Sequence, residues 1–240
     1  MAEALLKVRG LQAGYGDVQV LWGVDIEVPR GEIVCLVGSN GAGKTTLMRT
    51  ISGLVAARSG TLEFDGRQLV TGTPDKVLAA GIAHVPEGRR LFAAMSVRDN
   101  LLMGAYLRTD GNAAVDADLE RMYGLFPILR QRHGQDAGTL SGGEQQMCAI
   151  ARGLMGRPRL LLIDELSLGL APAVVDQLCD TLRMLNGEGL AVLVVEQDVA
   201  TALDLATQAF VMDTGRITRS GASAELLNDP AIREAYLGAI

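Results

Sequence analysis

Gly38-Ser39-Asn40-Gly41-Ala42-Gly43-Lys44-Thr45-Thr46 fits the pattern G-x-x-x-x-G-K-[ST]. An apolar run of strand length, Ile33 to Val37, precedes this stretch, and the residues up to Ile51 can continue it as a helix. A strand, a glycine-rich loop and a helix form the context in which such a loop binds phosphate groups. Small residues let backbone N–H groups close around phosphate oxygens, and the helix N-terminus adds a partial positive charge. The stretch therefore predicts a nucleotide-binding loop.

Three side chains of this loop carry specific chemistry. Lys44 can reach the β- and γ-phosphates of a nucleotide, and the hydroxyl of Thr45 can ligate Mg²⁺. Thr46 is expected on the side of the α-phosphate. The alternative is a flexible glycine-rich turn before an ordinary helix, but the Lys-Thr pair behind an apolar strand favours the phosphate site.

A second motif consists of the apolar run of residues 160–163 followed by Asp164 and Glu165. A carboxylate at the tip of a buried strand can hold Mg²⁺, directly or through water, which is the role expected for Asp164. Glu165 is then placed to orient and deprotonate a water molecule that attacks the γ-phosphate. Two carboxylates can also be plain solvated strand ends, and the phosphate loop upstream favours the catalytic interpretation.

A third motif reads Leu140-Ser141-Gly142-Gly143-Glu144-Gln145-Gln146. Ser141 and Glu144 match the Ser-x-x-Glu capping box that starts a helix. A capping box does not require the pair Gly142-Gly143, and these glycines leave the helix N-terminus open to a phosphate group. We therefore expect this segment to cap a helix and also to contact a nucleotide.

Composition limits the class of protein. The chain has 240 residues, of which 48% are hydrophobic and 21% charged, as in an average globular protein. Its net charge of −6 argues against a broad nucleic-acid-binding surface. Cys35, Cys148 and Cys179 lack C-x-x-C spacing, so we expect neither a disulfide framework nor a zinc site, and a reducing compartment fits. No secretory signal or membrane-spanning run is visible, so another chain must hold the protein at any membrane where it acts.

Alternating strand and helix patterns predict an α/β fold with a mostly parallel sheet. Glycines near the N-terminus indicate short strands, which with a hairpin around Asp65-Gly66 form a small antiparallel sheet beside the nucleotide-binding core. Residues 1–240 are expected to form one domain with a helical insertion at about 88–155. Strands are expected at 5–9, 18–21, 24–28, 33–37, 61–64, 67–70, 82–85, 160–163, 190–195, 210–212 and 217–219, and helices at 75–80, 97–107, 114–126, 145–155, 174–186, 200–205, 224–227 and 231–237.

With these motifs the chain resembles the ATP-binding-cassette (ABC) ATPases over essentially its whole length. The resemblance implies a P-loop NTPase core of the RecA-like type with an antiparallel β subdomain and a helical subdomain. It also implies a head-to-tail dimer that binds two ATP molecules with Mg²⁺. Ser141, Gly142, Gly143 and Glu144 would then complete the ATP site of the partner subunit, with Ser141 and Gly143 at the γ-phosphate.

Other positions take roles from the same resemblance. Tyr15 matches the aromatic residue that stacks on adenine, and its alternative is an ordinary surface tyrosine on a strand. Residues 167–170 occupy the loop that crosses to the partner, and Leu166 stands where the family usually has proline. Residues 91–95 lie in the neighbourhood that receives a short helix from the membrane subunit. For this apolar segment, ordinary core is an equal alternative.

Two departures from the family pattern are similar to the LivF-type subunits of branched-chain amino acid importers. Glu87 replaces the usual glutamine after the fourth core strand, and Gln197 replaces the usual histidine after the last one. Glu87 can ligate Mg²⁺ as an anion. Gln197 can donate an amide hydrogen bond to the γ-phosphate, but it cannot titrate as histidine does. At either position the alternative is a tolerated strand end.

The resemblance implies a cytoplasmic ATPase bound peripherally to the inner face of the cell membrane. Its expected partners are a second, LivG-like ATPase or another copy of itself, two membrane permease subunits, and indirectly an extracytoplasmic solute-binding protein. Nucleic acid is not an expected partner. The open alternatives are a urea, short-chain amide or other amino acid importer of the same subfamily, a soluble cassette ATPase that acts on ribosomes or DNA, and a nucleotide-binding adaptor that does not hydrolyse ATP.

Overall fold

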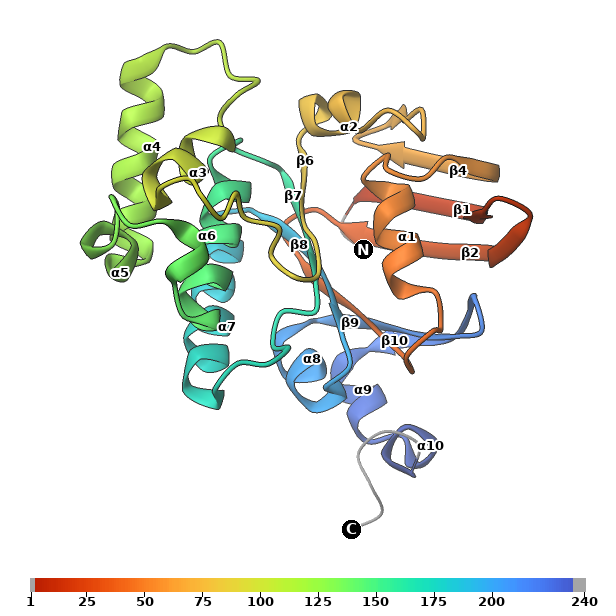
Figure 1. Cartoon of the computed structure of the whole chain (residues 1–240). Helices are drawn as coiled ribbons and strands as arrows, with labels where there is room; N and C mark the ends of the chain where they lie inside the picture. Colours follow the sequence, from red (N-terminus) through yellow and green to blue (C-terminus); the bar gives the residue numbers. More distant parts are fainter. Residues whose placement is uncertain (1–2, 235–240) are drawn as a thin grey trace.

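A six-stranded sheet with apolar residues on both faces runs through the centre of the molecule (Figure 1). In the computed structural model, which describes residues 3–234, its order is β10-β9-β3-β8-β7-β6. The strands are β3 (Ile33–Val37), β6 (Ile82–Val85), β7 (Leu160–Asp164), β8 (Ala191–Glu196), β9 (Gln208–Asp213) and β10 (Arg216–Ala222). The pairing is parallel throughout except between β9 and β10. The predicted α/β fold with a mostly parallel sheet is confirmed.

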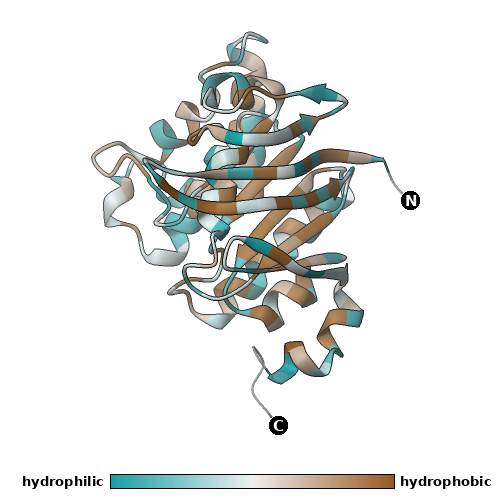
Figure 2. Ribbon diagram, turned by 90° about the vertical axis from the view of Figure 1, so that its right-hand side faces the viewer, coloured by the Kyte–Doolittle hydropathy of each residue, from teal (hydrophilic) through white to brown (hydrophobic). Residues whose placement is uncertain are grey.

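A second sheet is antiparallel and has the order β2-β1-β4-β5. It consists of β1 (Ala4–Tyr15), β2 (Val18–Pro29), β4 (Ala57–Phe64) and β5 (Arg67–Gln68). Helix α1 (Lys44–Ile51) packs between the two sheets, and its apolar residues share a core with both. The expected antiparallel sheet beside the nucleotide-binding core is therefore present, and Figure 2 shows apolar residues concentrated in the strands behind it.

The apolar residues of the central sheet alternate between two cores. In β3, Ile33, Cys35 and Val37 belong to the core that also contains the buried apolar residues of segment 97–185. Val34 and Leu36 belong to the core shared with α1 and the antiparallel sheet. Successive side chains of a strand point to opposite faces of the sheet. Because both faces of this sheet are buried, the strand sequences are continuously apolar.

The N-terminal strands are longer than the sequence suggested. Segments 18–21 and 24–28 were expected as separate strands, but they form the single strand β2, and β1 continues past residue 9 to Tyr15. Gly10 and Gly23 adopt positive φ angles of 57° and 80°, and the pairing of β1 with β2 shifts register near Gly10. These glycines are therefore accommodated as irregularities within continuing strands, as β-bulges are.

The remaining helices agree with the predicted ones in order, and their ends differ. They are α2 (Pro74–Ala80), α3 (Val97–Met103), α4 (Asn112–Leu125), α5 (Pro127–Gln131), α6 (Gly142–Leu154), α7 (Pro172–Gly187), α8 (Val199–Leu205), α9 (Ser223–Leu227) and α10 (Pro230–Ile232), with a 3₁₀ turn at Ala137–Thr139. Helix α5 was not among the predicted helices, although its first residue, Pro127, is a residue that often starts a helix. The helix expected at 231–237 begins at Pro230, and its last three residues lie outside the described part of the chain. Between residues 3 and 234, no helix is both long and apolar enough to cross a bilayer.

Helix α3 was expected to reach residue 107 but ends at Met103. The next residue, Gly104, lies against α6. A Cβ atom on Gly104 would lie 1.9 Å from the carbonyl oxygen of Arg152 and 3.0 Å from Cβ of Met155. The backbone at the end of α3 therefore touches the backbone of α6. This contact fixes the position of α3 relative to α6, the helix whose N-cap is Ser141.

We expect Gly104→Ala to destabilise the protein, because the added methyl group forces α3 away from α6. The expected loss is about 2 kcal/mol, the scale of core overpacking, or a fall in Tm of roughly 6 °C. Gly124→Ala in α4 is the matched control, since a Cβ there meets no atom within 4 Å. Its Tm should stay level or rise, because alanine is the better helix former. Equal Tm values for the two variants would contradict this packing.

Candidate nucleotide-binding site

The loop between β3 and α1 has the backbone that a phosphate site needs. Helix α1 begins at Lys44 with Gly43 as its N-cap, at φ 107°, and no side chain caps its first turn. The N–H groups of that turn therefore remain available to an anion. At the start of the loop, a Cβ on Gly38 would lie 2.2 Å from the carbonyl oxygen of Met212. Glycine is thus required at both positions. Gly43 needs it for its backbone conformation, and Gly38 needs it because no space is left for a side chain.

Lys44 lies over this loop. Its side-chain amine donates to the carbonyl oxygens of Gly38 at 2.7 Å and Ser39 at 3.1 Å, and the residue is only 5% exposed. The ammonium charge is thereby held above the loop before any ligand arrives. A phosphate oxygen at the same place would be a stronger acceptor, because a hydrogen bond between two charged groups exceeds one to a carbonyl.

Two carboxylates lie at the end of β7, where Asp164 is the last residue of the strand and Glu165 follows it. Asp164 is 1% exposed, and neither of its carboxyl oxygens has a hydrogen-bond partner among residues 3–234. Burial raises the pKa of Asp164 to about 6. Glu165 has a positive φ of 58°, which is unusual for a residue other than glycine. Its N–H donates to the carbonyl oxygen of Val195 at 3.0 Å, and burial raises the pKa of its carboxyl group.

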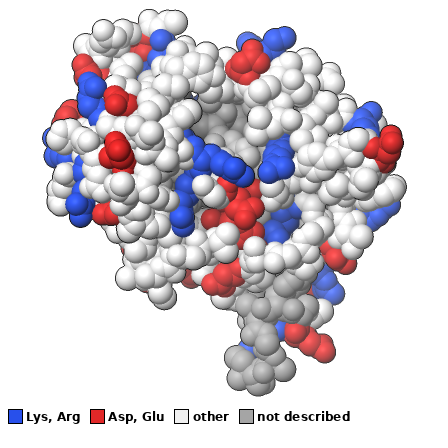
Figure 3. Space-filling view, viewed as in Figure 1, with Lys and Arg blue, Asp and Glu red and all other residues white. Residues whose placement is uncertain are grey.

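A cavity of about 350 Å³ collects most of the predicted site residues. Glu87 follows β6, Glu165 follows β7 and Gln197 follows β8, so parallel strand ends bring these three side chains together. The full lining comprises Val20, Asn40, Gly41, Gly43, Lys44, Thr45, Thr46, Glu87, Glu165 and Gln197. Figure 3 shows acidic and basic side chains gathered side by side near the middle of the face seen in Figure 1.

The donor set fits Mg²⁺ bound together with a nucleotide. Asp164 offers a buried carboxylate without a partner, and Thr45 and Glu87 lie beside the phosphate loop. Among the described residues no three His, Cys, Asp or Glu side chains form a metal cluster of their own. Mg²⁺ commonly binds through one or two carboxylates and completes its octahedron with waters and substrate phosphates. Thr45, Glu87 and Asp164 are therefore side chains of the kind that such a site uses.

Tyr15 ends β1 beside the phosphate loop. Its hydroxyl oxygen accepts hydrogen bonds from Thr46 Oγ1 at 3.5 Å and from Arg49 Nη1 at 3.3 Å. The residue is 43% exposed, so a face of the ring remains open to a ligand. A planar base on the outer side of the loop would find an aromatic surface here.

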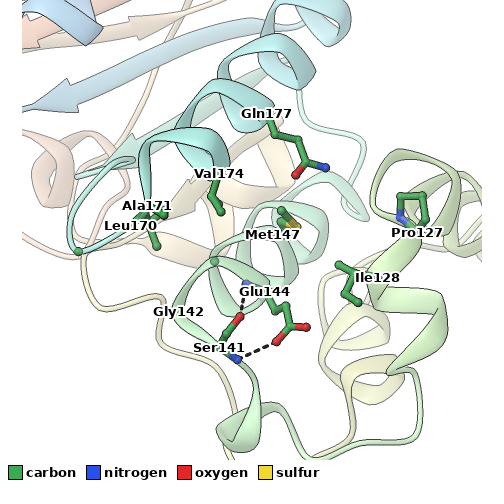
Figure 4. A pocket seen from close by; sticks show the side chains of 12 residues that line it. Pro127, Ile128, Ser141, Gly142, Glu144, Met147, Leu170, Ala171, Val174 and Gln177 are labelled. Carbon is green, nitrogen blue, oxygen red and sulfur yellow. Dashed lines mark hydrogen bonds between the residues drawn. The ribbon is translucent and has the colours of Figure 1, made fainter.

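The Ser-Gly-Gly segment lies in a different cavity, of about 620 Å³ (Figure 4). Its lining shares no residue with the cavity at the phosphate loop. Ser141 Oγ accepts from the N–H of Glu144 at 3.4 Å, and Glu144 Oε2 accepts from the N–H of Ser141 at 2.8 Å, which confirms the capping box at the start of α6. The lining comprises Pro127, Ile128, Ser141, Gly142, Gly143, Glu144, Met147, Gly169, Leu170, Ala171, Val174 and Gln177.

Gly143 has a structural role that the sequence did not reveal. A Cβ there would lie 2.9 Å from Cγ1 of Val174 on α7, so the glycine is needed for close packing within the chain. A Cβ on Gly142 would meet the flexible end of Arg89 at 3.3 Å. The expectation that the two glycines leave the start of α6 open to a phosphate therefore does not account for all that Gly143 does. A substitution at Gly143 would disturb α6 and α7 as well.

Sequence reasoning also missed Glu196. This residue ends β8 with 1% exposure, and burial raises the pKa of its carboxyl group to about 7. The available signal was a carboxylate directly after the apolar run 191–195, the same pattern that singled out Asp164.

A parallel sheet with a phosphate loop, a buried carboxylate pair and a separate Ser-Gly-Gly helix start together define an ATP-binding-cassette ATPase. Residues 21–167 match the ABC transporter family, and the chain belongs to this family.

Relatives of known name agree with this assignment. The chain is 46% identical over 224 residues to the high-affinity branched-chain amino acid transport ATP-binding protein BraG of Pseudomonas aeruginosa, covering 93% of this chain and 95% of that protein. It is 33% identical to the probable branched-chain amino acid transport ATP-binding protein LivF of Archaeoglobus fulgidus. That match covers 98% of this chain and 100% of that protein. A solved structure of a nucleotide-free ATP-binding cassette from an ABC transporter has the same fold, with a TM-score of 0.87 and 24% identity. The match covers 99% of this chain and 100% of that chain.

The buried carboxyl group of Asp164 predicts a pH dependence of stability in the nucleotide-free protein with metal chelated. Its pKa is raised from 3.8 to about 6 on folding, so the folded state binds the proton more tightly. The stabilisation is fully present below about pH 4 and is lost as the pH rises through about 6. Between pH 5 and 8 the free energy of unfolding should fall by on the order of 1 kcal/mol from this group, or about 3 °C in Tm.

Asp164→Asn removes that titration. Its Tm should depend less on pH between 5 and 8 than the wild-type Tm, and the difference between the two slopes isolates this carboxyl group. Thermal unfolding monitored at a series of pH values in EDTA measures both slopes. Identical slopes would mean that the carboxyl group is not desolvated in the folded protein.

Proposed function

We propose that this chain is the ATP-hydrolysing subunit of an importer for branched-chain amino acids, and that two cassettes together form each complete ATP site. The observation that carries the proposal is the separation of two half-sites. The phosphate loop and the Ser-Gly-Gly segment line different cavities of one chain. A second cassette arranged head to tail would bring its own Ser-Gly-Gly segment to the first chain's phosphate loop. The similarity to BraG and LivF supports the branched-chain amino acid as solute.

Within its own half-site the chain binds the triphosphate and Mg²⁺. Residues 38–46 cradle the phosphates, and Lys44 neutralises their charge. Thr45, Glu87 and Asp164 would hold the metal, which when bound would draw charge from the phosphate oxygens. Tyr15 stacks on the adenine ring.

Glu165 is the general base for the attacking water, and Gln197 orients that water and the γ-phosphate through its amide. The raised pKa of Glu165 suits this role, because a carboxylate of higher pKa is a stronger base near neutral pH. The carboxyl group and the amide line the same cavity as Lys44, which supports a joint action at one phosphate group.

The other half-site serves the ATP of the neighbour. Ser141, Gly142, Gly143 and Glu144 present the start of α6, a helix of 13 residues, to the γ-phosphate of the partner. The partner is a second copy of this chain or a related, LivG-like ATPase. Residues 88–155 form the helical subdomain that carries this half-site.

A third cavity, of about 520 Å³, is suited to a permease. Phe92 and Tyr106 line it and are 47% and 60% exposed, and Leu54 and Met103 add further exposed apolar surface. A short apolar helix from a membrane subunit would cover these side chains. Apolar side chains grouped on a surface in contact with water often mark such an interaction site. Two permease chains would hold the ATPase at the inner face of the membrane, and an extracytoplasmic solute-binding protein would deliver the amino acid.

Glu165→Gln is expected to bind Mg·ATP with near wild-type affinity and to lose at least about 100-fold in kcat, the scale of general-base catalysis. The ATP-bound dimer should accumulate, because the step that resolves it is slow. Phosphate release and size-exclusion chromatography with ATP measure the two effects. Glu225→Gln, at an exposed position on α9, is the matched control and should behave as wild type. A kcat within threefold of wild type for Glu165→Gln would remove this residue from the catalytic role.

Ser141→Asp tests whether α6 serves a neighbour. Aspartate caps a helix as well as serine does, so the chain should fold normally. Its negative charge would repel the partner's γ-phosphate, and ATP-dependent dimerisation and turnover should collapse. Ser141→Asn keeps the cap without the charge and should retain much more activity.

Mixing two inactive chains makes this test specific for action in trans. A Ser141→Asp chain has an intact phosphate loop, and a Lys44→Ala chain has an intact Ser-Gly-Gly segment. Their mixed dimer contains one complete site and should recover part of the ATP-dependent dimerisation that neither variant shows alone. Full activity of Ser141→Asp by itself would reduce the segment to a helix cap.

A further inference from the structure

Glu196 is a buried carboxylate to which no role has been given. It is the last residue of β8, 1% exposed, at the sheet edge where Asp164 ends β7 and the phosphate loop follows β3. Between residues 3 and 234 it has no Lys, Arg or His side chain within ion-pair distance. A charged group that is buried without a counterion is costly unless hydrogen bonds compensate for the lost water.

Three donors supply this compensation. Oε1 accepts from the backbone N–H of Ser167 at 2.7 Å. Oε2 accepts from the hydroxyl of Ser167 at 2.9 Å and from the backbone N–H of Gln197 at 3.2 Å. Ser167 is thus bound through both its main chain and its side chain by a single carboxylate. The bonds have normal lengths and fix the position of two separate segments.

These two segments belong to the two half-sites. Ser167 starts the turn closed by the bond from Leu170 N–H to the carbonyl oxygen of Ser167 at 3.0 Å. Gly169 and Leu170 in this turn line the cavity of the Ser-Gly-Gly segment. Gln197 lines the cavity of the phosphate loop. The carboxylate of Glu196 therefore joins a wall of one cavity to a wall of the other.

We propose that Glu196 is a positioning residue that couples the loop at residues 167–170 to Gln197. The placement of Gln197 at the chain's own γ-phosphate then depends on the same bonds that hold the loop beside the half-site serving the neighbour. This inference rests on the proposed two-chain ATP site. Glu196 itself lines neither cavity, and it acts through the residues that it binds.

The chemistry of an amide at this position makes the proposal testable. In Glu196→Gln, the amide oxygen can accept from the Ser167 N–H, and the amide nitrogen can donate to the Ser167 hydroxyl, whose oxygen also accepts. The same nitrogen then faces the N–H of Gln197, donor against donor. The variant retains the loop contacts and loses the link to Gln197. Ser167→Ala loses the hydroxyl bond alone.

Steady-state ATPase assays on the full-length chain, with ATP affinity and Tm measured in parallel, compare wild type, Glu196→Gln, Ser167→Ala and the double variant. We expect Glu196→Gln to bind ATP within about twofold of wild type and to lose at least about tenfold in kcat, the scale of a lost hydrogen bond to a charged group. Its Tm should change little, because removal of the buried carboxylate offsets the bond that the N–H of Gln197 loses. The double variant should lose clearly less than the product of the two single losses, since both changes act through one set of bonds.

Asp118→Asn is the control for general damage to a buried carboxylate. Asp118 is 8% exposed and pairs with Arg108 and Arg157, away from both cavities. Its variant should lower Tm and leave kcat per folded molecule unchanged. If the wild type hydrolyses ATP, two results would overturn the coupling. One is an unchanged kcat in Glu196→Gln, and the other is a loss in the double variant equal to the product of the two single losses. A wild-type chain without ATPase activity would instead overturn the proposed function, and the inference with it.

Discussion

Parallel pairing in the central sheet is the constraint on which the site depends. Val37 at the end of β3 lies opposite Glu196, and Asp164 at the end of β7 lies opposite Val195. The chain therefore delivers three segments far apart in sequence to one edge of the sheet. Both faces of these strands are apolar and covered, so charged groups can gather only where the strands end. The position of the chemistry follows from that restriction.

The same burial gives the site its electrostatic character. Lys44, Asp164 and Glu165 are between 1% and 8% exposed, and fixed charges act on one another more strongly when little water screens them. Asp164 has no partner of its own within the described chain. A ligand that brings a cation to this carboxylate and anionic oxygens to Lys44 satisfies both groups, and binding then stabilises the fold by mass action.

How well each part could be predicted depends on how local its interactions are. The phosphate loop and the capping box each involve a few consecutive residues, so residue types and spacing were sufficient. Contacts between distant segments could not be read in this way. Val174 lies against Gly143, and Ser167 binds Glu196, only because the sheet and its helices bring them together. The early strands were divided wrongly because a glycine signals a possible break and cannot show whether pairing resumes beyond it.

The separation of the two cavities has a consequence for where the enzyme works. If a complete site requires two cassettes, the turnover of free chains is second order in protein at low concentration and vanishes on dilution. Permease subunits that held two cassettes side by side, as proposed, would convert this encounter into an intramolecular one. The effective concentration would then reach the millimolar range expected for short tethers. ATP consumption would in this way be confined to assembled transporters, without any inhibitory segment.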